Sequence, residues 1–250
     1  MTESPVRSAQ RLRLPRYAAV PAGVHPPLLS PVYRSTVGRA PRQPLVDLPQ
    51  RLTEVTGPLL GEGRVTAQDA DLTAQGEVEP IGQRIVVQGS VRDSDGRPVP
   101  HTLVEVWQAN AAGRYRHLGD QWPAPLDPGF VGVGRTLTDA QGCYRFTTIR
   151  PGAYPWGNHH NAWRPAHIHF SLFGRAFTQR LVTQMYFPDD PLFGQDPIFN
   201  AIPAAARHRA VSRYSLDRTQ DNWALAFEWD IVLRGTGQTP FETDDDGDVA

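Results

Sequence analysis

Glycine and proline interrupt this chain so often that long helices have little room to form. The 250 residues include 22 glycines and 24 prolines, and apolar residues rarely recur at helical spacing. Short strands joined by ordered loops suit such a pattern, as in a sandwich or a barrel. The sequence predicts an all-β protein: a β-sandwich core with an extended N-terminal arm, long ordered loops and a few short helices.

Alternation of apolar and polar residues indicates where the strands lie. The clearest run covers residues 223–233, where one face is wholly apolar and the other is mixed, as in a half-buried strand. Two strands are predicted within residues 85–107 around Asp95-Gly96, a dipeptide favoured in tight hairpin turns. Further strands are predicted at residues 144–148, after a turn at 138–142, and at residues 180–187.

Helix signals are few and short. Asp47 could cap a turn that runs through Leu52. Asp196 followed by Pro197 resembles an N-cap with proline at the first helical position.

The two ends of the chain differ from its middle. Residues 1–45 are rich in proline and arginine without any period, so they cannot build a core of their own. They form either a disordered tail or an arm, and Leu28, Leu29 and Tyr33 favour the arm. We expect residues 1–80 to form this arm with a short helical segment, residues 81–240 the sandwich domain, and residues 241–250 a solvated acidic tail.

Composition excludes several classes of protein. A formal net charge of −1 argues against a nucleic-acid binder, which would present a basic face. The single cysteine, Cys143, cannot form an internal disulfide, which indicates a reducing compartment, and we expect its thiol to be buried and inert. No apolar run approaches membrane-spanning length, and the first 20 residues lack a secretory signal. A cytoplasmic protein is expected.

Histidines are concentrated in one short stretch, since four of the eight lie within residues 159–169. His167 and His169 flank Ile168, and alternate residues of a strand point to the same side. Both imidazoles should therefore project from one face and form half of a metal site. An ordinary amphipathic strand with two surface histidines is the alternative. His159 and His160 are expected to be structural or exposed.

The remaining ligands would decide the metal. A zinc or ferrous site would add a third histidine or a carboxylate, but Tyr154 and Tyr115 are what the neighbouring segments offer. A phenol, with a free pKa of about 10, binds as phenolate where a strongly Lewis-acidic ion such as Fe(III) stabilises it. From the residues alone, two interpretations are possible: a ferric site with two histidines and two tyrosines, or a Zn(II) or Fe(II) site in which some third ligand joins the two histidines.

Two stretches, residues 89–117 and 138–174, resemble the intradiol ring-cleaving dioxygenases, and residues 31–61 and 181–233 also fit. The most specific part is Tyr154 followed by Arg164-Pro165-Ala166 and His167-x-His169. The resemblance implies a non-haem Fe(III) enzyme that inserts both atoms of O2 into an aromatic substrate. The implied iron ligands are Tyr115 and His167 (equatorial) and Tyr154 and His169 (axial).

The resemblance also implies roles around the iron. Tyr154 would leave the metal when a catechol-bearing substrate chelates it, and would accept a proton. Arg164 would stabilise charge developing on the substrate, although a structural ion pair would also explain it. Trp156 would wall the substrate ring, Gln184 would hydrogen-bond near the reacting oxygens and Ile198 would pack on the substrate; each could equally be plain core.

The N-terminal region separates the branches of this family. The catechol and hydroxyquinol branches carry a helical N-terminal domain, whereas residues 1–80 here predict an arm with at most one short helix. The resemblance therefore implies the protocatechuate branch, in which an alpha subunit of similar fold completes a hetero-oligomer that forms 3-carboxy-cis,cis-muconate in the β-ketoadipate pathway. An intradiol dioxygenase for another catechol or hydroxyquinol, or a non-catalytic sandwich subunit, stays open.

Overall fold

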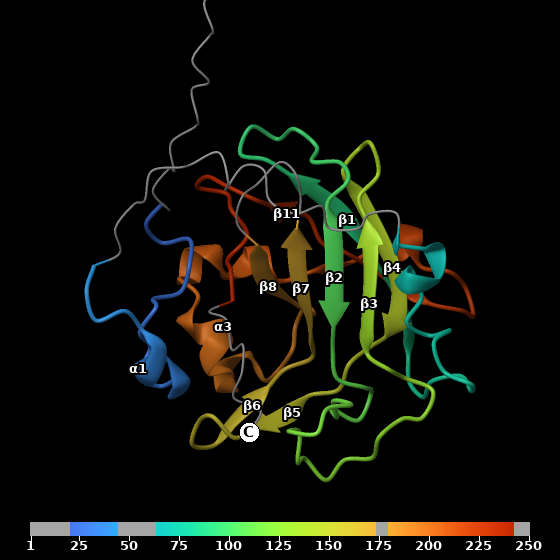
Figure 1. Ribbon diagram of the computed structural model, residues 1–250, viewed down its shortest axis with the longest axis horizontal. Helices are drawn as coiled ribbons and strands as arrows, with labels where there is room; N and C mark the ends of the chain where they lie inside the picture. The colour runs from blue at the N-terminus through green and yellow to red at the C-terminus, as the bar shows by residue number, and fades with distance from the viewer. Residues whose placement is uncertain (1–20, 45–63, 174–179, 243–250) are drawn as a thin grey trace, which may run out of the picture.

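Two β-sheets face each other in the computed structural model, which describes residues 21–44, 64–173 and 180–242 (Figure 1). The first sheet is ordered β11–β1–β10–β9, with β4 also paired to β1. Its strands are β1 (Arg84–Arg92), β4 (Cys143–Ile149), β9 (Arg213–Tyr214), β10 (Leu225–Glu228) and β11 (Ile231–Val232).

The second sheet is ordered β3–β2–β7–β8 with every pair antiparallel. Its strands are β2 (Leu103–Trp107), β3 (Val133–Leu137), β7 (His167–Phe173) and β8 (Leu181–Tyr186). A separate hairpin of β5 (Tyr154–Trp156) and β6 (Ala162–Arg164) lies beside the start of β7, at the lower end of the sheets in Figure 1. The predicted all-β sandwich is confirmed.

The core lies between the two sheets. Ile168, Phe170 and Leu172 of β7 are 0% exposed and pack with Ile85 and Val87 of β1. These residues alternate along their strands, so one face of each strand enters the core. Each such burial stabilises the fold by about 1.5–3 kcal/mol.

Helices are short and lie mainly to one side of the sheets. They are α1 (Ser35–Arg39), α3 (Pro197–Ala201) and the 3-10 turns η2 (Ala67–Ala70), η3 (Phe193–Gln195), η4 (Ala204–Ala210) and η5 (Leu216–Arg218). The carboxylate of Asp196 accepts the Ile198 N–H at 2.9 Å, with Pro197 at the first helical position. The predicted N-cap is confirmed. Within the described residues, no helix has the length and apolar character needed to span a membrane.

The two strands predicted within residues 85–107 and the turn around Asp95-Gly96 are present, although the two strands do not pair with each other. Asp93 N–H bonds to Arg97 O and closes the turn, but β1 and β2 belong to different sheets. After the turn, Val99 N–H still bonds to Val91 O of β1, while His101 N–H bonds to Thr138 O beside β3. The chain therefore crosses between the sheets at residues 99–101.

The predicted strand over residues 223–233 is present as two strands, β10 and β11, that pair with β1 in one continuous parallel register. Between them the Asp230 carboxylate accepts the Ser90 N–H at 2.8 Å, in place of a backbone carbonyl. The strands approach closely here: a Cβ on Gly89 would lie 1.7 Å from Trp229 O. Only glycine fits at this position.

Cys143 is exposed, so the expectation of a buried thiol was wrong. It begins β4, where exposed and buried residues alternate, and Tyr144 takes the inward position. The strands predicted at residues 144–148 and 180–187 correspond to β4 and β8.

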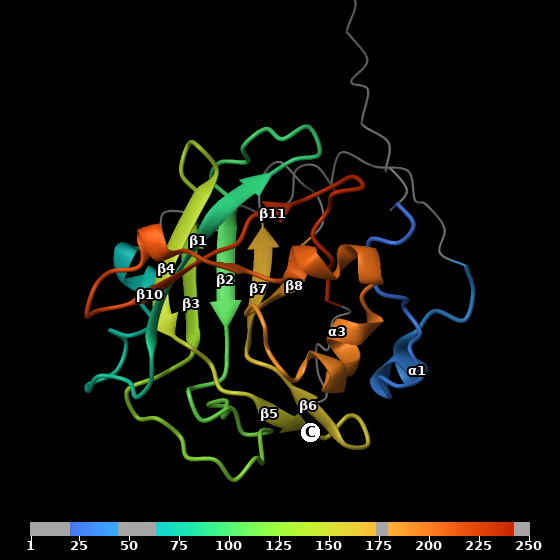
Figure 2. The ribbon, with the colours of Figure 1, turned by 180° about the vertical axis from the view of Figure 1, so that it is seen from behind.

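Residues 21–44 lie against the sandwich beside α3, as both ribbon views show (Figures 1 and 2). Val24 and Tyr33 are buried there, whereas Leu28 and Leu29 are exposed. The predicted turn from Asp47 to Leu52 lies outside the described residues.

Candidate functional site

The four side chains predicted as metal ligands converge in one cluster. Tyr154 Oη lies 3.5 Å from Tyr115 Oη and 3.3 Å from His167 Nε2. Tyr115 Oη also lies 3.2 Å from His169 Nε2. Two phenol oxygens and two imidazole nitrogens thus face one another, although they come from three separate segments.

Strand β7 supplies both histidines on one face, as the alternation predicted. Their ring centroids are 4.9 Å apart, and Ile168 between them enters the core. His169 is opposite Trp107 of β2 and Gln184 of β8. The Trp107 ring stacks on the His169 ring at 4.8 Å and 9°, so packing fixes the plane of that imidazole.

Hydrogen bonds at the far nitrogens set the histidine tautomers. His167 Nδ1 lies 2.7 Å from Pro165 O, and His169 Nδ1 lies 3.0 Å from Glu242 Oε2. A carbonyl or an ionised carboxylate only accepts, so each Nδ1 carries the proton. Burial, with Arg164 and His169 nearby, holds the pKa of His167 well below its usual range. Both Nε2 lone pairs therefore point at the tyrosines, as a metal ligand requires.

Tyr115 is positioned by a loop that packs against the start of β5. Its N–H donates to Asp120 Oδ2 at 2.7 Å. Gly113 has φ +77°, and a Cβ there would lie 2.3 Å from Ala153 O. Glycine is therefore required both by the backbone angle and by the close approach, and the approach brings Tyr115 to Tyr154.

Burial raises the pKa values of both phenols. For Tyr115 it rises well above the ordinary value, with the nearby Tyr154 adding to the effect. For Tyr154 burial also dominates, while the Arg164 cation acts in the opposite direction. Without a further cation both phenols stay protonated. As phenolates they would suit a small, highly charged metal ion, so the donor set fits a ferric ion.

Arg164 is buried beside this cluster, at the end of β6. Its Nε lies 3.1 Å from Asp196 Oδ1, and both side chains are almost completely buried. It also donates to Gln184 Oε1 and to Tyr186 Oη. Burial would lower the pKa of Arg164, but Asp196 and Tyr186 outweigh that effect and raise it. The structural ion pair left open by the sequence is present, and it holds a permanent cation next to Tyr154.

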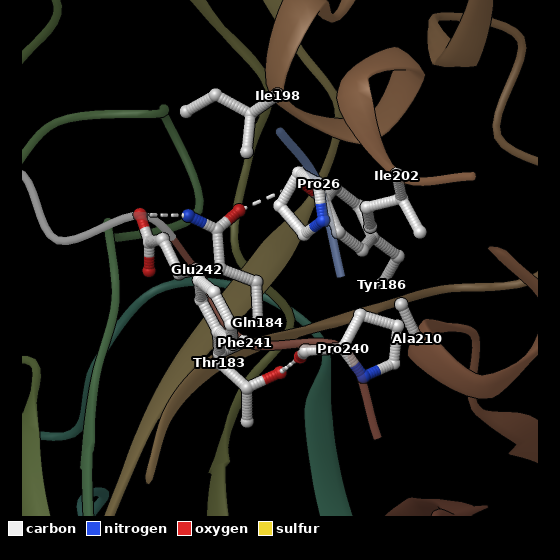
Figure 3. Close-up of a pocket in the computed structure, with 10 residues that line it drawn as sticks. All are labelled: Pro26, Thr183, Gln184, Tyr186, Ile198, Ile202, Ala210, Pro240, Phe241 and Glu242. Carbon is white, nitrogen blue, oxygen red and sulfur yellow. Dashed lines mark hydrogen bonds between the residues drawn. The ribbon is translucent and has the colours of Figure 1, made fainter. Parts of the chain in front are cut away.

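Trp156 and Gln184 contact Arg164, whereas Ile198 is buried in α3. Trp156 is half-buried, with its ring 5.7 Å from Arg164 Cζ. Gln184 and Ile198 line a small pocket, and Pro26 and Phe241 close it from the two ends of the described chain (Figure 3).

His159 and His160 lie in the turn between β5 and β6, apart from the hydrogen-bonded cluster, and His160 is exposed. Within residues 21–44, 64–173 and 180–242, no three His, Cys, Asp or Glu side chains are grouped so that they could hold a metal ion. The additional donors at the histidine pair are phenols.

Glu242 belongs to the site, so its assignment to a solvated acidic tail was wrong. It is 9% exposed and bonds to His169 and Gln184. Its N–H also donates to Val182 O of β8 at 2.7 Å. The apolar Phe241 just before it was the one sequence signal that this segment packs. Asp196 was predicted only as a helix cap, and Tyr186 was not singled out.

Comparisons with known proteins identify the family of this chain. The family described as "Dioxygenase" matches residues 55–235, and "Protocatechuate 3,4-dioxygenase beta subunit N terminal" matches residues 17–51. The protocatechuate 3,4-dioxygenase beta chain of Burkholderia cepacia is 59% identical over 87% of this chain and 94% of its own length. The alpha chain of Pseudomonas putida is 28% identical over 79% and 98%.

A solved structure shares the fold. The 3-chlorocatechol 1,2-dioxygenase of Rhodococcus opacus 1CP superposes with a TM-score of 0.51 over 67% of this chain and 65% of that one, at 22% identity. Its likeness supports the sandwich architecture, whereas the family match extends over most of the present sequence. On the length of that match and the identity to the Burkholderia cepacia chain, this protein belongs to the intradiol ring-cleaving dioxygenases.

Proposed function

We propose that this chain is the iron-bearing beta subunit of a protocatechuate 3,4-dioxygenase, which cleaves protocatechuate with O2 to 3-carboxy-cis,cis-muconate in aromatic catabolism. The observation that carries the proposal is the convergence of Tyr115, Tyr154, His167 and His169. It occurs in a chain that is 59% identical to a protein of that name.

The four converging side chains would hold a non-haem Fe(III), the tyrosines as phenolates and the histidines through Nε2. Bound there, the iron would withdraw electron density from a chelated catechol ring and open it to attack by O2. The protein contributes a fixed donor set: both histidines have a defined tautomer, and Trp107 stacks on the ring of His169. A preorganised set of this kind favours one geometry of binding.

Tyr154 is suited to exchange a proton with the substrate. Its Oη lies within 3.5 Å of a second phenol and of an imidazole nitrogen, and burial raises its pKa. A phenol with a raised pKa holds a proton firmly once it has one. We assign Tyr154 the role of accepting a catechol proton at Oη as the substrate binds.

Arg164 supplies positive charge where the reaction develops negative charge. Its guanidinium is held by Asp196, Gln184 and Tyr186 in a buried site, and a preorganised cation in such a site acts strongly on nearby charge. We assign Arg164 the role of stabilising negative charge on the substrate oxygens, and Trp156 the role of packing against the substrate ring. We assign Gln184 and Ile198 to substrate binding through the pocket that they line.

An alpha subunit completes the proposed enzyme, as an alpha-beta hetero-oligomer. Chains of both names are similar to this one, and the N-terminal beta-subunit family covers residues 17–51. We propose that residues 1–80 form the subunit-contacting arm and residues 81–240 the catalytic domain. The exposed Leu28 and Leu29 offer apolar surface for such a contact. We place the enzyme in the cytoplasm, where its single exposed thiol would stay reduced.

The decisive experiment is a visible absorption spectrum with metal analysis, recorded on the chain purified with its alpha subunit, before and after anaerobic addition of protocatechuate. We expect about one iron per chain and a tyrosinate-to-Fe(III) band that shifts with substrate. Tyr115→Phe and Tyr154→Phe should each remove part of the band. Tyr214→Phe, a change at an exposed tyrosine outside the cluster, should leave it intact.

Two results would overturn the proposal. A colourless protein that contains zinc would indicate a hydrolase-like metal enzyme. A protein that stays metal-free after reconstitution with iron would indicate a non-catalytic binding subunit. A band that shifts with catechol or hydroxyquinol but not with protocatechuate would retain the chemistry and change the substrate.

A further inference from the structure

We propose that Glu242 is a positioning residue for the metal centre: it fixes the tautomer and orientation of His169 and links them to Arg164. The inference rests on the proposed function, since it assigns a role toward the iron that His169 would bind. It concerns a residue from the far C-terminal part of the described chain, 73 residues after the histidine that it contacts.

Both carboxylate oxygens of Glu242 are engaged. Oε2 lies 3.0 Å from His169 Nδ1, and Oε1 accepts a hydrogen bond from Gln184 Nε2 (Figure 3). Because each oxygen has its own partner, the carboxylate has a single preferred orientation. It presents an acceptor to His169 Nδ1 and so keeps the Nε2 lone pair directed at the metal-binding cluster.

The same carboxylate connects His169 to the cation of the site. Gln184 donates to Glu242 through Nε2 and accepts from Arg164 and Tyr186 at Oε1. An amide has one donor end and one acceptor end, so the partners at both ends together fix its orientation. A buried hydrogen-bonded path therefore runs from His169 through Glu242 and Gln184 to Arg164, and a change at one end alters the position of the other.

The backbone around Glu242 is anchored on two sides. Glu242 N–H donates to Val182 O at 2.7 Å, and Pro240 O accepts from Thr183 Oγ1 at 2.6 Å, which attaches the segment to β8. Phe241 N–H donates to His25 Nδ1 at 3.1 Å, and the two rings are 4.0 Å apart. The segment is thus held between the sheet and residues 21–44, so that Glu242 is placed by packing.

Replacing Glu242 should loosen iron binding without dismantling the sandwich. Glu242→Ala leaves the Nδ1–H of a buried histidine without an acceptor, so the ring is no longer restricted to one tautomer. Loss of an outer partner of a metal-bound histidine weakens metal binding by about 10–100-fold. Glu242→Gln keeps one acceptor oxygen, so we expect a smaller loss that falls between wild type and Glu242→Ala.

The test is the rate of iron release to a chelator from the enzyme purified with its alpha subunit, followed through the tyrosinate band. We expect release to be about 10–100-fold faster in Glu242→Ala, with Glu242→Gln intermediate and the band shifted in both. Asp127→Asn is the matched control: Asp127 is also a buried carboxylate, but it accepts from Ile81 and Gly129 N–H groups outside the site. It should lower the melting temperature and leave the release rate unchanged.

The outcomes separate this inference from the proposed function. If wild type holds iron and all three variants release it at the wild-type rate, Glu242 has no positioning role, while the proposed function stands. If Asp127→Asn accelerates release as much as Glu242→Ala does, the effect is general destabilisation and the inference fails. If wild type itself holds no iron, the proposed function fails first.

Discussion

Strand β7 separates two interiors that are both buried but differ in chemistry. On one face, Ile168, Phe170 and Leu172 pack among apolar side chains between the sheets. On the other, His167 and His169 are 2% and 9% exposed and are surrounded by phenols, a carboxylate and an arginine. The apolar interior stabilises the fold through burial. In the polar interior, removing each polar or charged group from water costs free energy that its hydrogen bonds and ion pairs must offset.

The comparison teaches that the two interiors tolerate damage differently. Loss of volume in the apolar interior costs stability in proportion to the cavity left behind. In the polar interior each group depends on a specific partner, so removal of one member leaves another buried and unpaired. Three substitutions distinguish the two, from the largest expected effect to the smallest, and a pH dependence then tests the attachment of residues 21–44.

Asp196→Ala should have the largest effect on stability. It removes the partner of the buried Arg164 guanidinium and the cap of α3. An uncompensated buried charge costs about 3–5 kcal/mol. Urea unfolding should therefore show a loss of that size. A loss below about 1 kcal/mol, as expected of an exposed pair, would show that the arginine finds another partner or water.

Replacing both members of that pair should reverse the effect on stability but not on function. In Arg164→Met with Asp196→Leu no buried charge is left, and such replacements are often neutral or stabilising. Activity should nevertheless fall by about 100–1000-fold, because a preorganised charge-stabilising group is gone. Steady-state kinetics beside urea unfolding tests this. Wild-type kcat/KM in the double variant would assign Arg164 to structure alone.

Ile168→Val tests the apolar face between the two histidines. Removal of one buried methylene should cost about 0.5–1.5 kcal/mol without changing the tyrosinate band. Thermal unfolding and the visible spectrum together measure both. A shifted band with unchanged stability would mean that the two faces of β7 are coupled through the backbone.

Acid pH should weaken the attachment of residues 21–44. Burial, opposed by the side chain of Gln238, lowers the pKa of His25 from 6.5 to about 4. The unfolded chain therefore binds this proton first, so the contribution is complete above pH 6.5 and is lost as the pH falls toward 4. Neutral His25 accepts the Phe241 N–H at Nδ1, and a protonated ring cannot.

The pH dependence is measured as unfolding free energy between pH 7 and pH 4. His25→Gln should show a shallower decline than wild type, whereas His160→Gln, at an exposed histidine, should match wild type. Equal slopes in all three proteins would show that His25 does not contribute.

Much of the cluster of two histidines and two tyrosines could be predicted from the sequence because its pattern is local. His167 and His169 share a face through the period of a strand, and Asp196-Pro197 is a short-range helix signal. Tyr115 was less certain: the residues alone offered it as one possible donor, and the family resemblance singled it out. It meets Tyr154, 39 residues later in the chain, through a loop in which Gly113 packs on Ala153.

The sequence by itself determined the strand periodicity, the face shared by the two histidines and the family to which the motifs belong. Only the tertiary structure decided that the chain crosses from one sheet to the other at residues 99–101, that Asp196 pairs with Arg164, and that Glu242 is buried against His169. The reason is physical: periodicity and capping act between neighbouring residues, whereas these contacts join segments brought together only when the sheets pack. An acidic residue near the end of a chain has the same local pattern whether it is solvated or bonded to a buried imidazole.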